Sequence, residues 1–484
     1  MINAKDILQT ESQFVEIGRH AIGIDIGTST ICFTIFDIDT LSVISMRNID
    51  NTSSINHSDP RAHEQNPSKI WEIIENLFLQ SKEELSLVRI IAITGQMHGA
   101  ILLDDDNIPV SNLLTWRDAR YSVGQASNDF GKMNGCTLHV GYGANSISRM
   151  LRTQGGDTPG RKICSIESFI MGKLCGNFCV DESLAASFGC FDIVNKCWNE
   201  EQLEEMGLNR SLFGYVFPSC VPVAKILPAN SERYGLSIDT TVFAPIGDNQ
   251  ASVIGATGFL NTGVVNIGTS GQLSVPCSSM LYSKSIEVRP LLETGFLQVY
   301  SSLCGGWSYA YLKDFCKDLL AKFGFSLSDG QIYAVLDSLA VDSFESEGLV
   351  VDTRFLGTRE DSLLRGEICE IDTQNLNISN LAVGFIQGIV RELHPPAIRL
   401  ESISFIVASG NSVRKSPIMK RAIEQEFGCA CMEPPFLEEA SVGAVLGCLA
   451  NIEGKERIQA FYQKHFEKNE TTENTMRTIL YSNY

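Results

Sequence analysis

The sequence predicts an α/β fold with two domains. Strand-like apolar runs alternate along the chain with amphipathic helical patterns, which is the alternation from which α/β folds are built. At 484 residues the chain is also too long for one ordinary hydrophobic core. A short motif, Ile-Gly-Thr-Ser, occurs once from Ile26 and again from Ile267, which indicates one copy in each half.

The predicted elements of the first half begin with a hairpin. The stretch AIGIDIGTSTICFTIFD, residues 21–37, predicts two strands around a tight turn. Residues 67–85 have apolar side chains at helical spacing and Pro67 at the start, which predicts a helix. RIIAITG, residues 89–95, predicts a buried strand. The stretch 100–110 predicts a further strand followed by a solvated acidic turn over Asp104–Asp106.

The second half begins with a similar hairpin, GVVNIGTSGQLSV, residues 263–275. A later buried strand is expected in SISFIVASG, residues 402–410, followed directly by a helix. The Gly-rich stretch around Gly255–Gly263 is the expected domain boundary. The predicted parts are therefore an extension over residues 1–20 and domains over residues 21–258 and 259–484.

Composition and charge narrow the class of protein. A hydrophobic content of 44% and a charged content of 20% are typical of a globular protein. The net charge is −19 without a cluster of Lys and Arg, which argues against nucleic acid or an anionic membrane as the main partner. No apolar run approaches the ~18 residues of a membrane span. The 15 cysteines are expected to be buried thiols in a reducing cytoplasm, and oligomeric state is not predicted.

Each Gly-Thr-Ser turn is a candidate phosphate site. Gly27 and Gly268 are expected to take positive φ and to let a ligand approach the backbone. Hydroxyl and N–H donors of the following residues would then surround an anion. One such turn alone is better explained as a simple hairpin, but two turns can hold a polyphosphate. The candidate nucleotide residues of the turns are Gly27, Thr28, Ser29, Gly268, Thr269 and Ser270.

The residue before each motif differs, and the difference suggests a metal. Mg²⁺, the usual companion of ATP, is held by one or two carboxylates together with phosphates and water. Asp25 is the candidate carboxylate, whereas Asn266 adds no repulsion toward phosphate. Gly410 and Asn411 follow a predicted strand and are candidates for contact with the adenosine. The Walker and G-x-G-x-x-G patterns are absent from the sequence.

A polar segment after the third predicted strand suggests a hydroxylated acceptor. Gln96, Met97 and His98 follow that strand, and Trp116 and Asp118 come soon afterwards. Amide, imidazole and carboxylate groups pair with hydroxyls, and an indole packs on C–H faces. His98 alone would more simply be a structural histidine.

Asp248, in the stretch GDNQAS, is the candidate catalytic base. It follows a predicted strand and opens a helix of small residues, so it is also a candidate N-cap. The helix N-terminus would keep its carboxylate ionised, and an ionised carboxylate can accept a hydroxyl proton during phosphoryl transfer. Positioning, rather than a raised pKa, is its expected contribution.

Together these motifs resemble the FGGY carbohydrate kinases of the actin, hexokinase and Hsp70 superfamily. The likeness runs from about residue 21 to residue 450. It implies two ribonuclease-H-like domains with an active-site cleft between them, ATP and Mg²⁺ as cosubstrate and cofactor, and the roles given above. The stretch Ser183–Asn199 and the Asp248 segment are most similar to members that phosphorylate a seven-carbon ketose. The adenosine segment departs from the family, because Ser-Gly-Asn stands where a Gly-Gly pair is usual.

The main hypothesis is therefore an ATP-dependent ketose kinase, with a pentulose as the alternative acceptor. An actin- or Hsp70-like ATPase that acts as a regulatory module would explain both turns and Asp25. It would not explain Gln96, His98 and Asp248 together. A pseudokinase that senses sugar is the third interpretation, and the presence of Asp25 and Asp248 argues against it.

Overall fold

The computed structural model describes residues 19–121, 138–153, 160, 162–279, 285–292, 295–342, 344–358, 361, 363–395, 398 and 403–481. It divides into two compact units. The first groups Met1–Phe259 with Arg289–Phe296 and Phe436–Lys464, and the second groups Leu260–Val288 with Leu297–Pro435 and His465–Tyr484. Residues 1–18, nearly all of the expected N-terminal extension, lie outside the described residues.

The first unit is built on a mixed sheet with the strand order β14-β15-β6-β1-β2-β3, and β16 also pairs with β6. The strands are β1 (His20–Ile26), β2 (Thr30–Asp37), β3 (Ser42–Asp50), β6 (Val88–Gly95), β14 (Pro222–Lys225), β15 (Thr241–Phe243) and β16 (Ile246–Gly247). The first three strands form an antiparallel meander, and β6 runs parallel to β1. Because β1, β2 and β6 are apolar on both faces, helices must cover both sides of the sheet.

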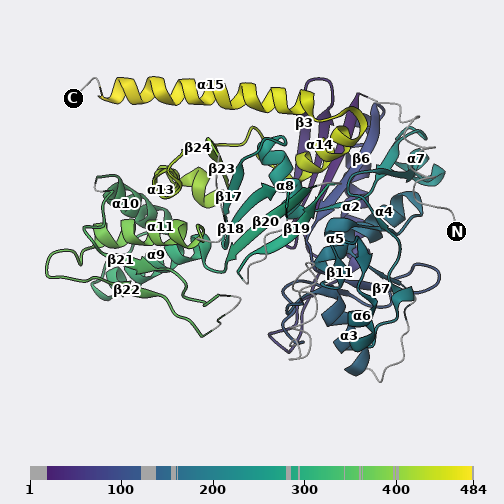
Figure 1. Cartoon of the computed structure of the whole chain (residues 1–484), viewed down its shortest axis with the longest axis horizontal. Helices are drawn as coiled ribbons and strands as arrows, with labels where there is room; N and C mark the ends of the chain where they lie inside the picture. The colour runs from purple at the N-terminus through teal and green to yellow at the C-terminus, as the bar shows by residue number, and fades with distance from the viewer. Residues whose placement is uncertain are drawn as a thin grey trace. The chain divides into compact units, whose positions relative to one another are not determined.

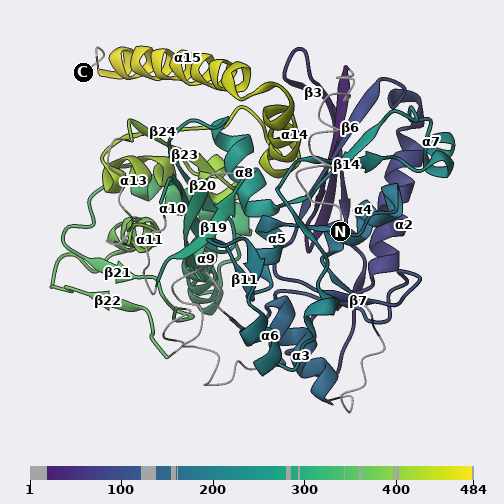
Figure 2. The same ribbon diagram turned by 45° about the vertical axis from the view of Figure 1, so that its right-hand side comes forward.

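Two pairs of helices cover that sheet (Figures 1 and 2). On one face α8 (Asp248–Thr257) packs closely against α14 (Glu439–Glu453), and both contact β6. On the other face lie α2 (Pro67–Gln80) and α4 (Ile166–Cys175). Their apolar side chains join those of the strands in one buried cluster that includes Ile24, Phe33 and Phe78.

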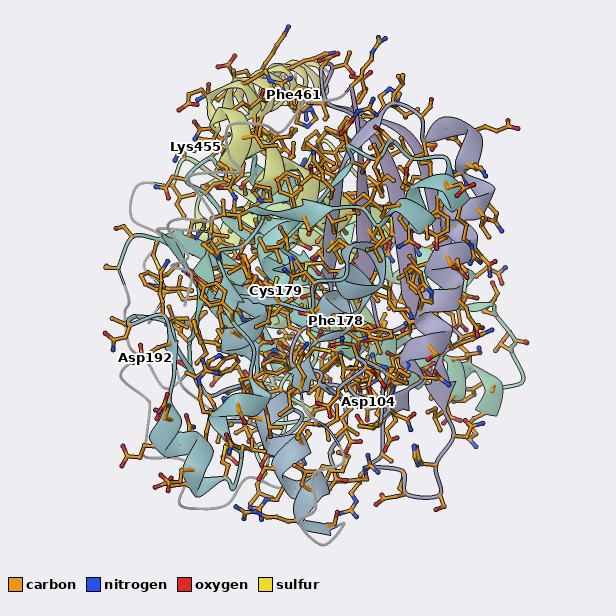
Figure 3. All side chains as sticks on the ribbon, turned by 90° about the vertical axis from the view of Figure 1, so that its right-hand side faces the viewer. Asp104, Phe178, Cys179, Asp192, Lys455 and Phe461 are labelled. Atoms are coloured by element: carbon orange, nitrogen blue, oxygen red, sulfur yellow. The ribbon has the colours of Figure 1, made fainter. Side chains whose placement is uncertain are left out.

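Short elements fill the rest of the first unit. They are β4 (Ser54–Ile55), β5 (Glu64–Gln65), η1 (Lys82–Glu84), β7 (Ile101–Leu103), β8 (Leu113–Leu114), α3 (Gly143–Thr153), β9 (Lys162–Cys164), β10 (Val180–Asp181), α5 (Glu182–Ser187), β11 (Phe191–Asp192), β12 (Cys197–Trp198), α6 (Glu200–Glu205), η3 (Arg210–Leu212), β13 (Val216–Phe217) and α7 (Pro228–Tyr234). Figure 3 labels Asp104, Phe178, Cys179 and Asp192 in this part of the chain.

The second unit contains a sheet with the order β19-β20-β18-β17-β23-β24. Its strands are β17 (Gly263–Ile267), β18 (Gly271–Cys277), β19 (Glu287–Leu291), β20 (Gly295–Ser302), β23 (Phe405–Ser409) and β24 (Ala430–Met432). Residues Arg289–Phe296, at the β19–β20 connection, group with the first unit. The remaining elements are α9 (Gly305–Lys322), α10 (Asp329–Asp342), β21 (Val350–Asp352), β22 (Glu367–Cys369), α11 (Ile378–Glu392), α12 (Asn411–Lys415) and α13 (Pro417–Phe427). Helix α15 (Glu456–Tyr481) is shared, because its residues up to Lys464 group with the first unit and those from His465 with the second.

The two halves repeat one arrangement of strands. In each, an antiparallel hairpin is followed much later by a strand parallel to its first arm, β6 for β1 and β23 for β17. Asp25 pairs in register with Thr94, and Asn266 pairs in register with Ser409. The two copies of the motif therefore occupy equivalent places in two similar sheets.

The strands and helices expected from the sequence are confirmed, with two local differences. The helix expected over residues 67–85 ends at Gln80, and a 3-10 turn follows. The helix expected after Gly410 is broken at Ser416, because the residue before Pro417 is disfavoured in the helical region. Within the described part of the chain, no helix is long and apolar enough to cross a membrane.

Candidate active site

The first Gly-Thr-Ser turn joins β1 to β2, and protein donors occupy all three of its carbonyl groups. Asn51 Nδ2 donates to the Gly27 carbonyl at 2.8 Å, and the Asn51 N–H donates to the Ser29 carbonyl at 2.8 Å. Gln65 Nε2 donates to the Thr28 carbonyl at 2.8 Å. Among the described residues no acceptor takes the N–H groups of Thr28 and Ser29. The turn therefore presents donors, as an anion site requires.

The second turn, between β17 and β18, has the same polarity. The N–H of Gly306 donates to the Gly268 carbonyl at 2.9 Å, and the N–H of Trp307 donates to the Thr269 carbonyl at 3.1 Å. The Ser270 carbonyl accepts from the N–H of Gly268 at 3.0 Å. Within the described ranges the N–H groups of Thr269 and Ser270 have no protein acceptor. Both turns thus offer amide and hydroxyl donors at an exposed tip.

The expectation of positive φ at Gly27 and Gly268 is wrong, because neither residue has it. Each glycine instead leaves space beside the backbone that a side chain would fill. A Cβ on Gly27 would lie 2.8 Å from the Thr30 carbonyl oxygen, so a side chain would collide with the returning strand. A Cβ on Gly268 would have no neighbour within 4 Å, so the space beside that backbone is open to a ligand.

Asp25 lies at the end of β1 and fits a cation. Its Oδ1 is buried and has no hydrogen-bond partner among the described residues. Burial, with added repulsion from Asp248 and Glu438, raises the pKa of Asp25 to about 8. A carboxyl group in this setting is stabilised as the carboxylate by a bound cation, so the residues present fit a Mg²⁺ ion.

The residues at the equivalent place in the second unit are neutral. Asn266 Nδ2 donates to Ser409 Oγ at 2.8 Å and so holds the ends of β17 and β23 together. The next residue, Gly410, has a φ of 94°, and a Cβ there would lie 2.5 Å from the Ile267 carbonyl oxygen. Asn411 then begins the short helix α12. The structure thus brings Gly410 and Asn411 next to the second turn.

Residues 96–98, which the sequence predicts to bind a hydroxylated substrate, follow β6 and lie beside the first turn. Gln96 is 3% exposed, and its Oε1 accepts from Thr28 Oγ1 at 3.0 Å. Met97 packs against Gly247, the residue before Asp248, where a Cβ would lie 2.8 Å from the Met97 sulfur. His98 has a φ of 72°, stacks on Tyr142 at 4.2 Å and hydrogen-bonds Ser187 through its N–H and ring. Structural contacts therefore hold the imidazole of His98.

Trp116 and Asp118 lie nearby in different surroundings. Trp116 is 44% exposed, and its Nε1 donates to Thr28 Oγ1 at 3.0 Å. Asp118 is fully buried, and its carboxylate accepts from the N–H of His63 and from Arg120, whose Nη2 lies 2.6 Å away. Because Arg120 occupies this carboxylate, Asp118 can bind a hydroxylated substrate only after Arg120 has moved away. Asp104 forms the solvated turn expected of it, because its Oδ1 accepts the N–H groups of Asp106 and Ile108.

Asp248 is the first helical residue of α8, and Gly247 is the N-cap. The candidate N-cap role of Asp248 is therefore wrong. Burial raises the pKa of Asp248 to about 6, although the Arg289 charge and the N–H of Asn249 oppose this shift. The pKa is thus higher than the helix N-terminus alone predicts, yet most of the carboxylate is ionised at neutral pH.

Comparisons with known proteins show what this chain is similar to. Residues 20–255 match the family model of the FGGY family of carbohydrate kinases, N-terminal domain. Sedoheptulokinase of Mus musculus is 22% identical over 450 residues, which cover 84% of this chain and 92% of the mouse protein. Xylulose kinase of Staphylococcus epidermidis is 24% identical over 396 residues, which cover 77% of this chain and 75% of that protein. Residues 20–255 therefore form an N-terminal domain of the FGGY family of carbohydrate kinases.

Solved structures of similar fold cover nearly the whole chain. Gluconate kinase from Lactobacillus acidophilus has a TM-score of 0.79 and 18% identity, covering 94% of this chain and 98% of the kinase. Plasmodium falciparum glycerol kinase with ADP has a TM-score of 0.78 and 17% identity, covering 95% of this chain and 98% of that one. The predicted fold of two ribonuclease-H-like domains is confirmed.

The stretch Ser183–Asn199 contacts His98 and Gly247, the residue before Asp248. Ser183 Oγ accepts the N–H of Gly247 at 2.8 Å, and Ser187 holds His98. Asp181, which caps α5, accepts from Ser183 and Ser219. These hydrogen bonds therefore hold two parts of the candidate sugar-binding site in place.

Sequence reasoning missed four features near these residues. Asn51 and Gln65 hold the first turn, and the Gly305–Gly306 pair lets α9 begin against the second turn. Arg289 is 5% exposed, and its Nη1 lies 3.1 Å from Asn249 Oδ1. Glu167 is fully buried beneath Gly95, where a Cβ would lie 2.5 Å from its Oε1. Of these, only the Gly-Gly pair gives a signal that a sequence reader can recognise.

Proposed function

We propose that this protein transfers the terminal phosphoryl group of ATP to a hydroxyl group of a ketose. One observation supports this most strongly. Both Gly-Thr-Ser turns have all their carbonyl groups occupied by protein donors, while their Thr and Ser N–H groups have no protein acceptor in the described part of the chain. Each unit has one such turn, and turns of this kind suit the phosphates of a nucleotide.

The first unit supplies groups for the acceptor as well. Asp248, with a pKa raised to about 6 by burial, is ionised at neutral pH and can take a proton. In the proposed step the acceptor oxygen bonds to the γ-phosphorus, the bond from that phosphorus to ADP breaks, and the hydroxyl proton passes to the Asp248 carboxylate. Gln96 and Trp116 would orient the acceptor, with Met97, His98 and Asp118 around them.

Asp25 would hold Mg²⁺, since its buried oxygen has no partner among the described residues. When bound, the ion would neutralise charge on the transferring phosphoryl group. Most of the described cysteines are buried free thiols, which fits the cytoplasmic location that the sequence predicts, although Cys197 is exposed.

For the acceptor we propose sedoheptulose, with sedoheptulose 7-phosphate as the product that would feed the pentose phosphate pathway. The similarity of Ser183–Asn199 and the Asp248 segment to sedoheptulokinases supports seven carbons, as does the likeness to the mouse enzyme. Xylulose is the runner-up, because xylulose kinases are also among the relatives. Each buried partner left unpaired by a shorter sugar costs about 1–3 kcal/mol, which permits roughly ten- to hundredfold discrimination.

The test is to compare kcat/KM for sedoheptulose, D-xylulose and D-ribulose at saturating ATP and Mg²⁺, using coupled ADP release. We expect the highest value with sedoheptulose. If either pentulose gives a higher value, the substrate assignment is wrong while the kinase assignment stands.

A regulatory ATP-binding module is the alternative from another class of protein. It accounts for the two turns and Asp25, but it assigns no role to an ionised Asp248 beside Met97 and the acceptor segment. ATP hydrolysis that no sugar stimulates would favour this alternative.

A further inference from the structure

Gln65 lies in β5, is fully buried, and takes part in a closed ring of hydrogen bonds in the first unit. Gln65 Nε2 donates to the Thr28 carbonyl at 2.8 Å, and Thr28 Oγ1 donates to Gln96 Oε1 at 3.0 Å. Gln96 Nε2 completes the ring by donating to Gln65 Oε1 at 2.7 Å. The ring therefore links the first phosphate turn to the acceptor segment.

Donor and acceptor chemistry allows only one orientation of this ring. A backbone carbonyl can only accept, so Gln65 must turn its amide nitrogen to Thr28 and its oxygen to Gln96. Gln96 must then present its nitrogen to Gln65 and its oxygen to Thr28. Trp116 Nε1 can only donate, and it donates to Thr28 Oγ1 at 3.0 Å. The single hydroxyl proton of Thr28 is therefore committed to Gln96.

This commitment sets up a competition for one proton. To donate to a phosphate oxygen, the Thr28 hydroxyl must release Gln96 Oε1. Gln96 is 3% exposed and held through its nitrogen by Gln65, so it cannot easily turn toward water for a new donor. A sugar hydroxyl bound at Gln96 would supply that donor. A buried hydrogen-bond acceptor without a donor is costly, so the sugar relieves the cost that phosphate binding creates at Gln96.

We propose that Gln65 is a positioning residue, which holds Gln96 so that Gln96 and a phosphate group compete for the Thr28 hydroxyl proton. As a consequence, the nucleotide and the sugar bind synergistically. The proposal rests on the proposed function, because it assigns phosphate to Thr28 and a hydroxylated acceptor to Gln96. The linkage is reciprocal: the nucleotide raises sugar affinity by the factor by which sugar raises nucleotide affinity.

The first test needs no acceptor. Binding of the Mg²⁺ complex of adenylyl imidodiphosphate is measured by calorimetry for the wild type, Gln65→Leu and Gln96→Leu. Removing or loosening Gln96 frees the Thr28 proton, so both variants should bind the nucleotide analogue about three- to tenfold more tightly than the wild type. Gln202→Leu is the matched control, because Gln202 is buried in the same unit and neither side-chain polar atom has a partner among the described residues.

The second test measures synergy directly. The affinity for sedoheptulose is compared with and without the nucleotide analogue, and the wild type is expected to bind the sugar about tenfold more tightly when the analogue is present. Thr28→Ser keeps the hydroxyl and should keep the tightening. Thr28→Val lacks the proton and should lose it, as should Gln65→Leu.

Outcomes separate the coupling from the function. If the wild type phosphorylates a sugar but Gln96→Leu binds the analogue no more tightly, or Thr28→Val keeps the synergy, the coupling is wrong and the function stands. If Gln96→Leu binds more tightly but no sugar is phosphorylated, the competition stands and the function falls. A wild type that does not bind the analogue overturns both.

Discussion

Asp248 is the residue on which the proposed chemistry depends most, and a nearly isosteric change tests it. Asp248→Asn removes the proton acceptor but keeps the shape of the side chain at the start of α8. Turnover should fall by about 10²-fold or more, as expected when a general base is lost. Sugar affinity, measured by calorimetry, should change little. Turnover within a few-fold of the wild type would remove Asp248 from the catalytic role.

Arg289 should set the pH range in which Asp248 is active. The Arg289 charge lowers the pKa of Asp248, which burial raises to about 6. Arg289→Gln removes this charge, so the pKa rises and more Asp248 is protonated near neutral pH. The acid limb of the kcat/KM profile should move up by about one pH unit. Arg289→Lys keeps the charge and should shift the limb less. Coincident profiles for all three proteins would contradict this role.

Glu167 should make the protein less stable as pH rises. Burial raises the pKa of Glu167 to about 8 from an ordinary value of 4.5, so the folded state keeps a proton that the unfolded state has lost. Stability therefore falls between about pH 4.5 and pH 8. Glu167→Gln has no proton to lose, so its advantage in melting temperature should grow by several degrees between pH 5.5 and pH 8. Melting curves that stay equally far apart at both values would contradict this.

At the scale of the element, the helix that carries Asp248 is held by backbone contact with α14. A Cβ on Gly443 would lie 1.8 Å from the Ala251 carbonyl oxygen, and a Cβ on Gly255 would lie 1.9 Å from the Glu439 carbonyl oxygen. Both helices also pack on β6. The small residues of both helices therefore let α8 approach α14 closely beside the sheet (Figure 1).

Gly443→Ala should separate the two helices. Overpacking of this kind costs about 1–3 kcal/mol, so the melting temperature should fall by several degrees, and turnover should fall because α8 moves. Gly330→Ala is the control, since a Cβ there meets nothing within 4 Å and alanine favours a helix. A Gly443→Ala variant as stable as this control would show that α8 and α14 are not tightly packed.

Elements with a local pattern could be predicted from the sequence. The hairpin over residues 21–37 and the strand after Val88 show as apolar runs bounded by turn residues, and α2 shows as helical spacing after Pro67. Gln65 gave no such signal, because its role depends on Thr28 and Gln96, which lie far away in the chain. Arg289 and Glu167 were missed for the same reason.

The molecule as a whole is proposed to couple ATP use to a sugar. Each unit carries one Gly-Thr-Ser turn, while the candidate sugar-binding residues and Asp248 belong to the first unit. When no sugar is bound, ATP can be cleaved only if a water molecule takes the place of the sugar hydroxyl beside Asp248. Synergistic binding through Gln65 would oppose this, because the nucleotide and the sugar favour one another.

The most direct test of this account is the stoichiometry of ADP and sugar phosphate in one reaction. Purified protein is incubated with ATP and Mg²⁺, with and without sedoheptulose, and both products are quantified. The account predicts negligible ADP without sugar and one sedoheptulose phosphate formed for each ADP released with it. ADP release at the same rate with and without sugar, and no sugar phosphate from any ketose, would contradict it.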